Sequence, residues 1–407
     1  MKCRHCHTEL ELKFLDLGNA PPSNAYLKEQ DLQKPEITYP LRILTCTNCW
    51  LVQTEDYTEA DELFNEDYAY FSSTSKGWLK HASDYCTMIT KRLGLSKDSF
   101  VVEIASNDGY LLKNFVASNI PCLGIEPTKS TADDATAIGV PVRQEFFGKD
   151  VGVKMANAGE QADLVLGNNV YAHVPDINDF TKGVVALLKS NGVVTFEFPH
   201  LLQLVQQNQF DTVYHEHFSY LSLCAVRSVF KAAGLRIFDV EELGTHGGSL
   251  RVYGCLQDAN YEEHNSVHDV LGHEIDAGLQ KKETYSAFQQ KADAVKDGLV
   301  RFLLEAKAEG KTVAGYGAAA KGNTLINYAG IRPDLIPFIC DAAKSKIGQY
   351  MPASHIPILS PSALDENRPD YLVILPWNIA EEVMKQNAHL AEKGTKFVTA
   401  VPELKVT

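Results

Sequence analysis

The densest group of reactive side chains in the 407-residue sequence occupies residues 214–220, which read YHEHFSY. Two imidazoles, a carboxylate and two phenols in so short a segment exceed what a protein core normally carries, and these groups can donate and accept protons. An extended chain would place Tyr214 and Glu216 on one face and His215 and His217 on the other, whereas a turn would gather Tyr214, Glu216 and His217. The sequence leaves both arrangements open.

A third histidine, His173, lies within residues 168–176, which read NNVYAHVPD and follow an apolar run. A single histidine is more often a structural hydrogen-bonding group than a catalyst. Three histidines near one predicted sheet edge favour a functional site, and we expect His173 to lie where an acceptor substrate would bind.

Two cysteine pairs have the spacing of metal ligands: Cys3 with Cys6, and Cys46 with Cys49. Four thiolates suit tetrahedral Zn²⁺ in a closed structural site, which has no open position for a substrate. Residues 3–7 also match the CxxCH pattern of covalent haem attachment, but the second pair and the polar N-terminus favour zinc. The predicted ion would supply folding free energy on the order of 10 kcal/mol.

The middle of the chain has the clearest pattern of strands and helices that could position the reactive side chains. Apolar runs at residues 100–104, 122–126, 162–167 and 192–198 read as buried strands separated by helical patterns. This alternation predicts an α/β fold with a mostly parallel sheet and a ligand at the carboxyl ends of its strands. Residues 15–24, between the cysteine pairs, are rich in turn formers and predict turns rather than core.

The turn after the first predicted strand carries Glu103, Ala105, Asn107 and Gly109 at alternate positions. It lacks the three glycines that let a dinucleotide approach the backbone, so a smaller, cationic ligand fits better. Glu126 ends the next strand, where a carboxylate can accept both hydroxyls of a ribose. The pattern resembles the class I methyltransferases. That resemblance implies S-adenosylmethionine, with its amino-acid part at Glu103 and its ribose at Glu126; an acidic turn that binds nothing is the alternative.

The last third of the chain predicts one long helix over residues 281–307 and then a second α/β unit. The strands of this unit are expected at residues 312–317, 336–341 and 371–376. We expect the long helix to form the connection into this last domain.

A small-residue turn opens that second unit, with Gly315 and Gly317 ahead of a helix. Its backbone N–H groups could bind phosphate, and Lys321 would add positive charge, although close helix packing explains the glycines nearly as well. Read as a nicotinamide site, the same turn would use Asp341 as its ribose acid. That interpretation leaves residues 214–220 without a role.

Asp and Glu number 52 against 38 Lys and Arg, which gives a net charge of −14. An acidic chain is a poor partner for nucleic acid or an anionic membrane. No apolar run approaches the ~20 residues of a membrane helix, and the N-terminus is polar where a signal peptide would be apolar, so we expect a cytoplasmic protein. The length predicts two or three domains in a monomer or weak oligomer.

Three motif blocks follow one another along the chain: the cysteine pairs, residues 214–220 and residues 315–324, which read GYGAAAKGNT. In this order they resemble the zinc-containing sugar C-methyltransferases over essentially the whole chain. The resemblance implies a zinc-binding module (1–60), a Rossmann-like S-adenosylmethionine-binding methyltransferase domain (61–256) and a Rossmann-like substrate-binding domain (257–407). It also implies methylation at C3 of a dTDP- or GDP-linked 4-keto-6-deoxyhexose in branched deoxysugar biosynthesis.

The resemblance assigns site residues of three kinds. The catalytic residues are Tyr68, His173, Tyr214, Glu216 and His217. The cofactor-binding residues are Glu103, Ala105, Asn107, Gly109, Glu126 and Asn168. The substrate-binding residues are Asn169, Tyr316, Gly317, Lys321 and Asn323. Tyr70 leaves the assignment of Tyr68 open, and Ala105 stands where relatives commonly have glycine.

Carbon methylation beside a ketone needs a base, a group that stabilises the enolate and an aligned sulfonium. Our hypothesis is that His217 removes the C3 proton and that Glu216 orients it or holds a sugar hydroxyl. Tyr214 or His173 would then donate a hydrogen bond to the C4 oxyanion. An NAD(P)-dependent nucleotide-sugar oxidoreductase and a non-catalytic zinc-ribbon binding protein are the alternative functions.

Overall fold

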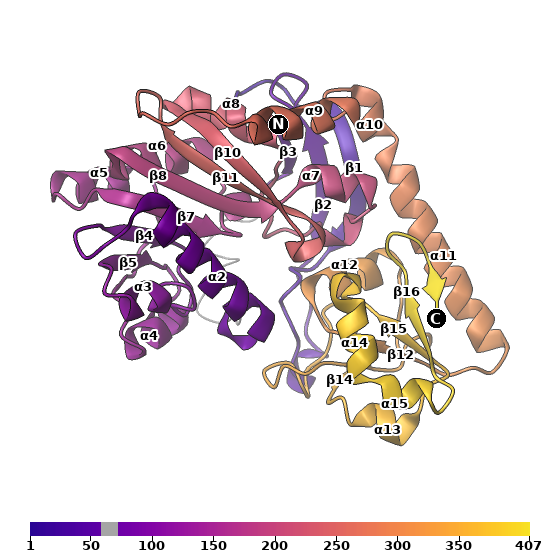
Figure 1. The fold of residues 1–407 in the computed structure, drawn as a ribbon. Coiled ribbons are helices and arrows are strands. Elements are labelled where there is room, and N and C mark those ends of the chain that lie inside the picture. Colours follow the sequence, from indigo (N-terminus) through magenta and orange to yellow (C-terminus); the bar gives the residue numbers. More distant parts are fainter. Residues whose placement is uncertain (58–71) are drawn as a thin grey trace.

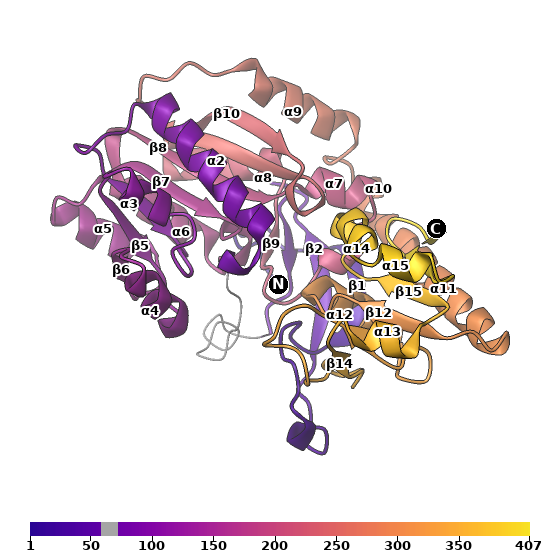
Figure 2. The ribbon, with the colours of Figure 1, turned by 60° about the horizontal axis from the view of Figure 1, so that its bottom comes forward.

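The computed structural model describes residues 1–57 and 72–407, and the strands in these ranges form three sheets. Figure 1 and Figure 2 show a central sheet and a C-terminal sheet on opposite sides of an N-terminal sheet. The predicted α/β class is confirmed. In the described ranges, no helix has both the length and the apolar character needed to cross a bilayer.

The N-terminal sheet is antiparallel and takes one strand from the middle of the chain. Its order is β1 (Leu12–Ala20), β2 (Tyr39–Thr45), β3 (Val52–Thr54) and β9 (Ser219–Tyr220). Strand β9 is the end of the YHEHFSY segment. Its pairing with β3 therefore attaches that segment to the part of the chain that carries the cysteines.

Strand β1 corrects the prediction of turns over residues 15–24. Most of this segment is extended, and Leu15 and Leu17 are buried in a core. The register of β1 against β2 shifts twice along its length. These irregularities break the alternation of apolar and polar residues by which a strand is recognised in a sequence.

The central sheet has the order β10-β11-β8-β7-β4-β5-β6, in which neighbours from β8 to β6 are parallel and β10 and β11 are antiparallel. Its strands are β4 (Val101–Ile104), β5 (Cys122–Ile125), β6 (Val142–Arg143), β7 (Ala162–Asn168), β8 (Leu188–Pro199), β10 (Leu235–Leu243) and β11 (Ser249–Leu256). The mostly parallel sheet predicted from the apolar runs is therefore confirmed.

Helices cover both faces of this sheet. They are α2 (Lys76–Leu93), α3 (Lys113–Ala117), α4 (Lys129–Ala137), α5 (Lys149–Asn157), α6 (Ile177–Leu187), α8 (Leu223–Ala233) and α9 (Asn265–Asp276). Helix α7 (Leu201–Gln206) instead packs in the core shared by the N-terminal sheet and the C-terminal unit. Val101 and Leu164 belong to the core formed with α2, whereas their chain neighbours Val102 and Val165 belong to the core formed with α6 and α8. Continuous apolar strands are the consequence, because both faces are buried.

The C-terminal sheet has the order β14-β13-β12-β15-β16-β17 and is parallel except for β17. Its strands are β12 (Val313–Tyr316), β13 (Ile339–Cys340), β14 (Ile358–Leu359), β15 (Tyr371–Ile374), β16 (Lys396–Thr399) and β17 (Lys405–Val406). Its helices are α12 (Ala320–Tyr328), α13 (Ala363–Asn367), α14 (Ala380–Gln386) and α15 (Ala388–Ala391). The expected single helix over 281–307 is instead α10 (Lys282–Ser286) followed by α11 (Phe288–Ala308).

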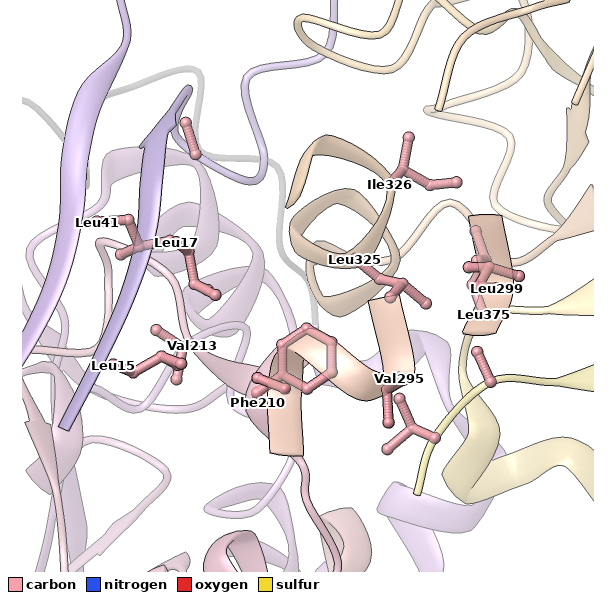
Figure 3. Close-up of a cluster of buried hydrophobic side chains, with 14 of the residues drawn as sticks. Leu15, Leu17, Leu41, Phe210, Val213, Val295, Leu299, Leu325, Ile326 and Leu375 are labelled. Carbon is pink, nitrogen blue, oxygen red and sulfur yellow. The ribbon is translucent and has the colours of Figure 1, made fainter. Parts of the chain in front are cut away.

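A shared core joins the N-terminal sheet to the C-terminal unit, as Figure 3 shows. Leu15 and Leu41 of the N-terminal sheet, Leu299 of α11 and Leu325 of α12 belong to one buried cluster. Val213 belongs to the same cluster and directly precedes the YHEHFSY segment. The segment is thus held at the junction of the units.

Candidate active site

A cavity of about 1070 Å³ lies where the carboxyl ends of β4, β5 and β7 face the C-terminal unit. Ile104, Ile125 and Asn168 line it from the central sheet, and Lys321 lines it from α12. Asn24, from the loop after β1, also reaches the cavity. Residues from the central sheet, from the C-terminal unit and from the loop after β1 of the N-terminal sheet therefore all line this cavity.

One acidic side chain lines the cavity where β4 and β5 end. Glu126 lines it, and its carboxylate accepts hydrogen bonds of 2.9 Å from the backbone N–H groups of Asn107 and Thr128. Burial raises the pKa of the Glu126 carboxyl, although these donors oppose the shift. The two donors fix the carboxylate in a single orientation, as expected of a group that must meet a ligand at a defined angle.

Glu103 is buried in β4 beneath the turn and is not among the lining residues. Within the described residues, its Oε2 has no hydrogen-bond partner. Burial, together with repulsion from Glu126 and Asp108, raises the pKa of the Glu103 carboxyl. A cationic group bound near the turn would reduce this repulsion, and Glu126, which does line the cavity, fits the ribose of S-adenosylmethionine.

The turn that follows β4 has unusual backbone geometry. Ala105 and Asn107 both line the cavity and both have positive φ, +55° and +50°. Gly109 does not line the cavity; its φ is +74°, and an added Cβ would lie 3.0 Å from a Val140 methyl group. The turn thus needs glycine at position 109 for close packing rather than for access to a ligand.

Asn168 ends β7, Asn169 follows it, and both residues line the cavity. Both polar side-chain atoms of Asn168 are buried and, among the described residues, have no partner. Asn169 donates from Nδ2 to His246 Nε2 at 3.1 Å. The unmet amide of Asn168 is what a polar ligand would satisfy.

The YHEHFSY segment forms a turn rather than an extended strand up to β9. His217 N–H donates to the Tyr214 carbonyl at 3.0 Å, and Tyr214, Glu216 and His217 all line the cavity. His215 turns away and contacts the Pro40 carbonyl at 3.3 Å. The structure thus selects the arrangement that gathers the tyrosine, the glutamate and the second histidine.

His173 and His217 each have a defined tautomer. His173, in the short helix η3 (Tyr171–His173), donates from Nδ1 to the Glu216 carbonyl at 2.8 Å, and His217 donates from Nδ1 to the Thr212 carbonyl at 3.1 Å. Because each Nδ1 carries the proton, each neutral ring has its lone pair on Nε2. Burial lowers the pKa of His173 to about 4, and burial together with the nearby His173 holds the pKa of His217 well below its usual range.

Glu216 is buried, and its Oε1 accepts a hydrogen bond of 3.2 Å from Asn24 Nδ2. Its Oε2 has no partner in the described part of the chain. Burial raises the pKa of this carboxyl. The hypothesis that Glu216 orients His217 is not supported by a contact, because the group that accepts from His217 Nδ1 is the Thr212 carbonyl.

The C-terminal unit contributes a cationic wall to the cavity. Lys321 donates from Nζ to Asn378 Oδ1 at 2.7 Å, and Lys346 donates from Nζ to the Ala318 carbonyl at 2.7 Å. Both lysines line the cavity beside Ala320, the first residue of α12, and burial lowers the pKa of both. Two half-buried cations beside the first turn of a helix form an environment suited to an anion.

Three of the predicted substrate-binding residues do not line this cavity. Asn323 donates to the Ser23 carbonyl at 3.1 Å, and Tyr316 belongs to the buried core of the C-terminal unit. Gly317 has φ +90°, and an added Cβ would lie 2.4 Å from Pro376 Cδ, so close packing explains this glycine. Of the predicted catalytic residues, Tyr68 lies outside the described residues.

Sequence reasoning missed Asn24, His246 and Lys346, which all line the cavity. None lies in a motif, and His246 follows β10 in the short helix η5 (Thr245–Gly247). Asp341, the ribose acid of the oxidoreductase alternative, accepts hydrogen bonds from the backbone N–H of Ala318 and does not line the cavity.

The four paired cysteines form one cluster near the N-terminus. Their Sγ atoms all lie within 4.8 Å of one another, with 3.6 Å between Cys3 and Cys49 and 3.4 Å between Cys6 and Cys46. Zinc–sulfur bonds in a tetrahedron space the sulfurs about 3.8 Å apart, so the cluster fits Zn²⁺. Gln53 Nε2 donates to Cys3 Sγ at 3.3 Å, which supports the ligand from outside.

A sheet covered on both faces, with acidic residues and a cavity at the carboxyl ends of its parallel strands, defines a Rossmann-like methyltransferase fold. Comparisons with known proteins give the family. Residues 3–64 match the model "Putative zinc binding domain", residues 78–240 match "Methyltransferase domain" and residues 244–402 match "C-methyltransferase C-terminal domain".

The C-methyltransferase NovU of Streptomyces niveus is 34% identical to this chain over 405 residues, which cover 100% of this chain and 96% of NovU. The chain therefore belongs to the zinc-containing, S-adenosylmethionine-dependent C-methyltransferases, with S-adenosylmethionine and a structural zinc ion as its cofactors.

Solved structures with limited similarity include magnesium protoporphyrin IX methyltransferase of Synechocystis PCC 6803 with bound SAH (13% identity, TM-score 0.35, covering 44% of this chain and 84% of that one). Another is an S-adenosylmethionine-dependent methyltransferase of Clostridium acetobutylicum ATCC 824 (13% identity, TM-score 0.34, covering 48% of this chain and 95% of that one).

Proposed function

We propose that this C-methyltransferase methylates C3 of a nucleotide-linked 4-keto-6-deoxyhexose through an enolate formed by a histidine base. The observation that carries the proposal is the pair of buried imidazoles, His173 and His217, whose Nδ1 protons are both committed to backbone carbonyls. Rings held in this way remain neutral at physiological pH, and the neutral His217 ring has the Nε2 lone pair that a base needs. Methylation of a heteroatom that is already nucleophilic would not need a base of this kind.

We assign removal of the C3 proton to Nε2 of His217. The Tyr214 ring lies 4.1 Å from the His217 ring between centroids, and both residues line the cavity. Neutral His173 has only a lone pair on Nε2, so its ring cannot donate to an oxyanion, and we assign the hydrogen bond to the C4 oxygen to the Tyr214 hydroxyl. S-adenosylmethionine supplies the electrophilic methyl group.

Glu216 fits a role in holding the sugar. Its carboxyl is buried and its pKa is raised by that burial, which favours the protonated form. A carboxylic acid can donate one hydrogen bond and accept another, and a sugar hydroxyl can do the same. We therefore assign a substrate hydroxyl to Glu216.

The cationic wall supports a nucleotide-linked substrate. Lys321 and Lys346 line the cavity from the C-terminal unit, whereas Glu126 lines it from the central sheet. The net charge of the chain is −14, so these lysines are a local exception. A diphosphate would neutralise the two ammonium groups and meet the N-terminal N–H groups of α12. At about 1070 Å³, the cavity exceeds the roughly 300–1,000 Å³ of common ligand pockets and has room for donor and acceptor together.

Mass spectrometry with a panel of dTDP- and GDP-linked 4-keto sugars tests this function. The protein and S-adenosylmethionine should add one methyl group to at least one member of the panel, and fragmentation should place that group on C3. Methylation on oxygen or nitrogen, or no methylation of the panel by protein that binds S-adenosylmethionine, would contradict the proposal.

A further inference from the structure

The loop between β1 and β2 leaves the N-terminal sheet and runs along the C-terminal unit. Figure 2 shows this indigo segment beside β14. Asn323 Nδ2 donates to the Ser23 carbonyl at 3.1 Å, and Tyr26 donates from its hydroxyl to the Ala318 carbonyl at 2.5 Å. Leu27 and Tyr350 exchange backbone hydrogen bonds of 3.0 and 2.8 Å. The loop is thus attached to the C-terminal unit at successive points.

Asn24 lies between the first two of these attachments and faces the other way, into the cavity. Its Nδ2 donates to Glu216 Oε1 at 3.2 Å, across 192 positions of sequence. The contact leaves Glu216 Oε2 as the carboxyl oxygen without a partner among the described residues. A loop of the zinc-binding part of the chain therefore determines which oxygen of Glu216 remains for a ligand.

We propose that Asn24 is a positioning residue for methyl transfer: its amide holds Oε1 of Glu216 so that Oε2 meets the acceptor. The inference rests on the proposed function, because it assumes that Glu216 contacts the substrate. It also gives the N-terminal module a part in catalysis beyond folding.

The neighbouring tyrosines do not titrate together with Glu216. Tyr26 and Tyr220 feel the charge of Glu216, and burial raises the pKa of both phenols, so they remain protonated over the working pH range. The hydrogen bond from His173 Nδ1 to Glu216 is accepted by the backbone carbonyl rather than by the carboxyl group. The hydrogen bond from Asn24 lowers the pKa of Glu216 against the larger effect of burial.

Two substitutions separate positioning from simple packing. In Asn24→Ala the donor is lost, and kcat should fall about tenfold or more while the affinity for S-adenosylmethionine stays unchanged. The limb of the pH profile that belongs to Glu216 should move to higher pH, because a carboxylate without its donor holds its proton more tightly. Asn24→Asp has the same size but lacks the amide donor, so it should not restore the activity that Asn24→Ala loses at pH 8.

Asn19→Ala is the matched control, because Asn19 is exposed near the end of β1, shortly before the loop that carries Asn24. It should keep wild-type kcat and pH profile. An Asn24→Ala enzyme with wild-type kcat and pH profile, or an Asn24→Asp enzyme more active than Asn24→Ala, would overturn the inference.

A substrate-free measurement keeps this test separate from the proposed function. Infrared difference spectra against Glu216→Gln report the titration of the Glu216 carboxyl, whose midpoint should rise in Asn24→Ala. If wild-type protein methylates no 4-keto sugar, the proposed function fails. In that case, a raised titration midpoint of Glu216 in Asn24→Ala would still support the contact between Asn24 and Glu216. An unchanged midpoint would overturn the positioning role of Asn24.

Discussion

The rings of His173 and His217 meet edge to face, with 4.7 Å between their centroids and 68° between their planes. Each ring gives its Nδ1 proton to a carbonyl of residues 212–216. The same short segment therefore fixes the tautomer of both imidazoles, one from η3 and one from its own turn. Two neutral bases held this close also resist protonation, because a charge on one disfavours a charge on the other.

The lowered pKa of His173 makes folding stability depend on pH. An unfolded histidine has a pKa of about 6.5, whereas burial lowers the pKa of His173 to about 4. Between these values the unfolded chain thus binds more protons than the folded chain. The contribution of His173 to the free energy of unfolding is therefore complete above pH 6.5 and is lost as the pH falls toward 4. The loss should be on the order of 3 kcal/mol.

Urea unfolding of the wild type and His173→Gln at pH 4.5 and 7.5 measures this dependence. The wild type should lose more stability on acidification than the variant does. His389→Gln is the control, because His389 is exposed and should leave the wild-type dependence unchanged. An equal acid loss in wild type and His173→Gln would show that His173 is not held neutral by burial.

Glu126→Gln should weaken binding of S-adenosylmethionine. The carboxylate already has two backbone donors that orient it, and its remaining lone pairs are those a ribose diol would use. Loss of the charge should raise the dissociation constant about 10- to 100-fold in calorimetry. Glu392→Gln serves as the control, because Glu392 is exposed. Unchanged affinity for S-adenosylmethionine in Glu126→Gln would show that the cofactor binds elsewhere.

Loss of zinc should reach the catalytic segment. Val52 of β3 pairs with Tyr220 of β9, so the sheet next to the cysteine cluster also holds the end of YHEHFSY. In Cys46→Ser, metal analysis should find less than one zinc per chain, and kcat should fall with the melting temperature. Cys224→Ser, outside the cluster, should keep one zinc and full activity. A zinc-free Cys46→Ser enzyme with normal kcat would contradict the coupling.

Lys321→Ala and Lys346→Ala should each raise KM for the nucleotide sugar about 10- to 100-fold, since each removes a charged donor from the cationic wall. The affinity for S-adenosylmethionine should not change. Lys344→Ala is the matched control, because Lys344 is exposed two residues before Lys346. If the affinity for S-adenosylmethionine changes while KM for the sugar does not, the cationic wall binds the methyl donor rather than the nucleotide sugar, and the assignment is wrong.

The sequence predicts well those parts of the fold that depend on neighbours in the chain. The strands of the central sheet are continuous apolar runs because helices cover both faces, and the zinc ligands are recognisable by spacing alone. Strand β1 was missed because its irregular pairing hides the alternation that marks a strand.

The candidate site likewise has a part that local sequence predicts and a part that only tertiary packing brings together. Tyr214, Glu216 and His217 lie within one turn and could be grouped from the sequence. Asn24 meets Glu216 only because the loop after β1 is attached to the C-terminal unit, and Lys346 reaches the cavity through the same packing. Contacts of this kind depend on tertiary structure and leave no local pattern.

Hydrogen exchange at C3 of the 4-keto sugar tests the central claim most directly. In deuterated buffer with S-adenosylhomocysteine in place of the methyl donor, the wild type should introduce deuterium at C3 without methylation. His217→Ala, still folded and still binding S-adenosylmethionine, should slow both the exchange and the methylation by about 10²- to 10⁴-fold. Exchange at the wild-type rate in His217→Ala would contradict the account, because another group would then be the base.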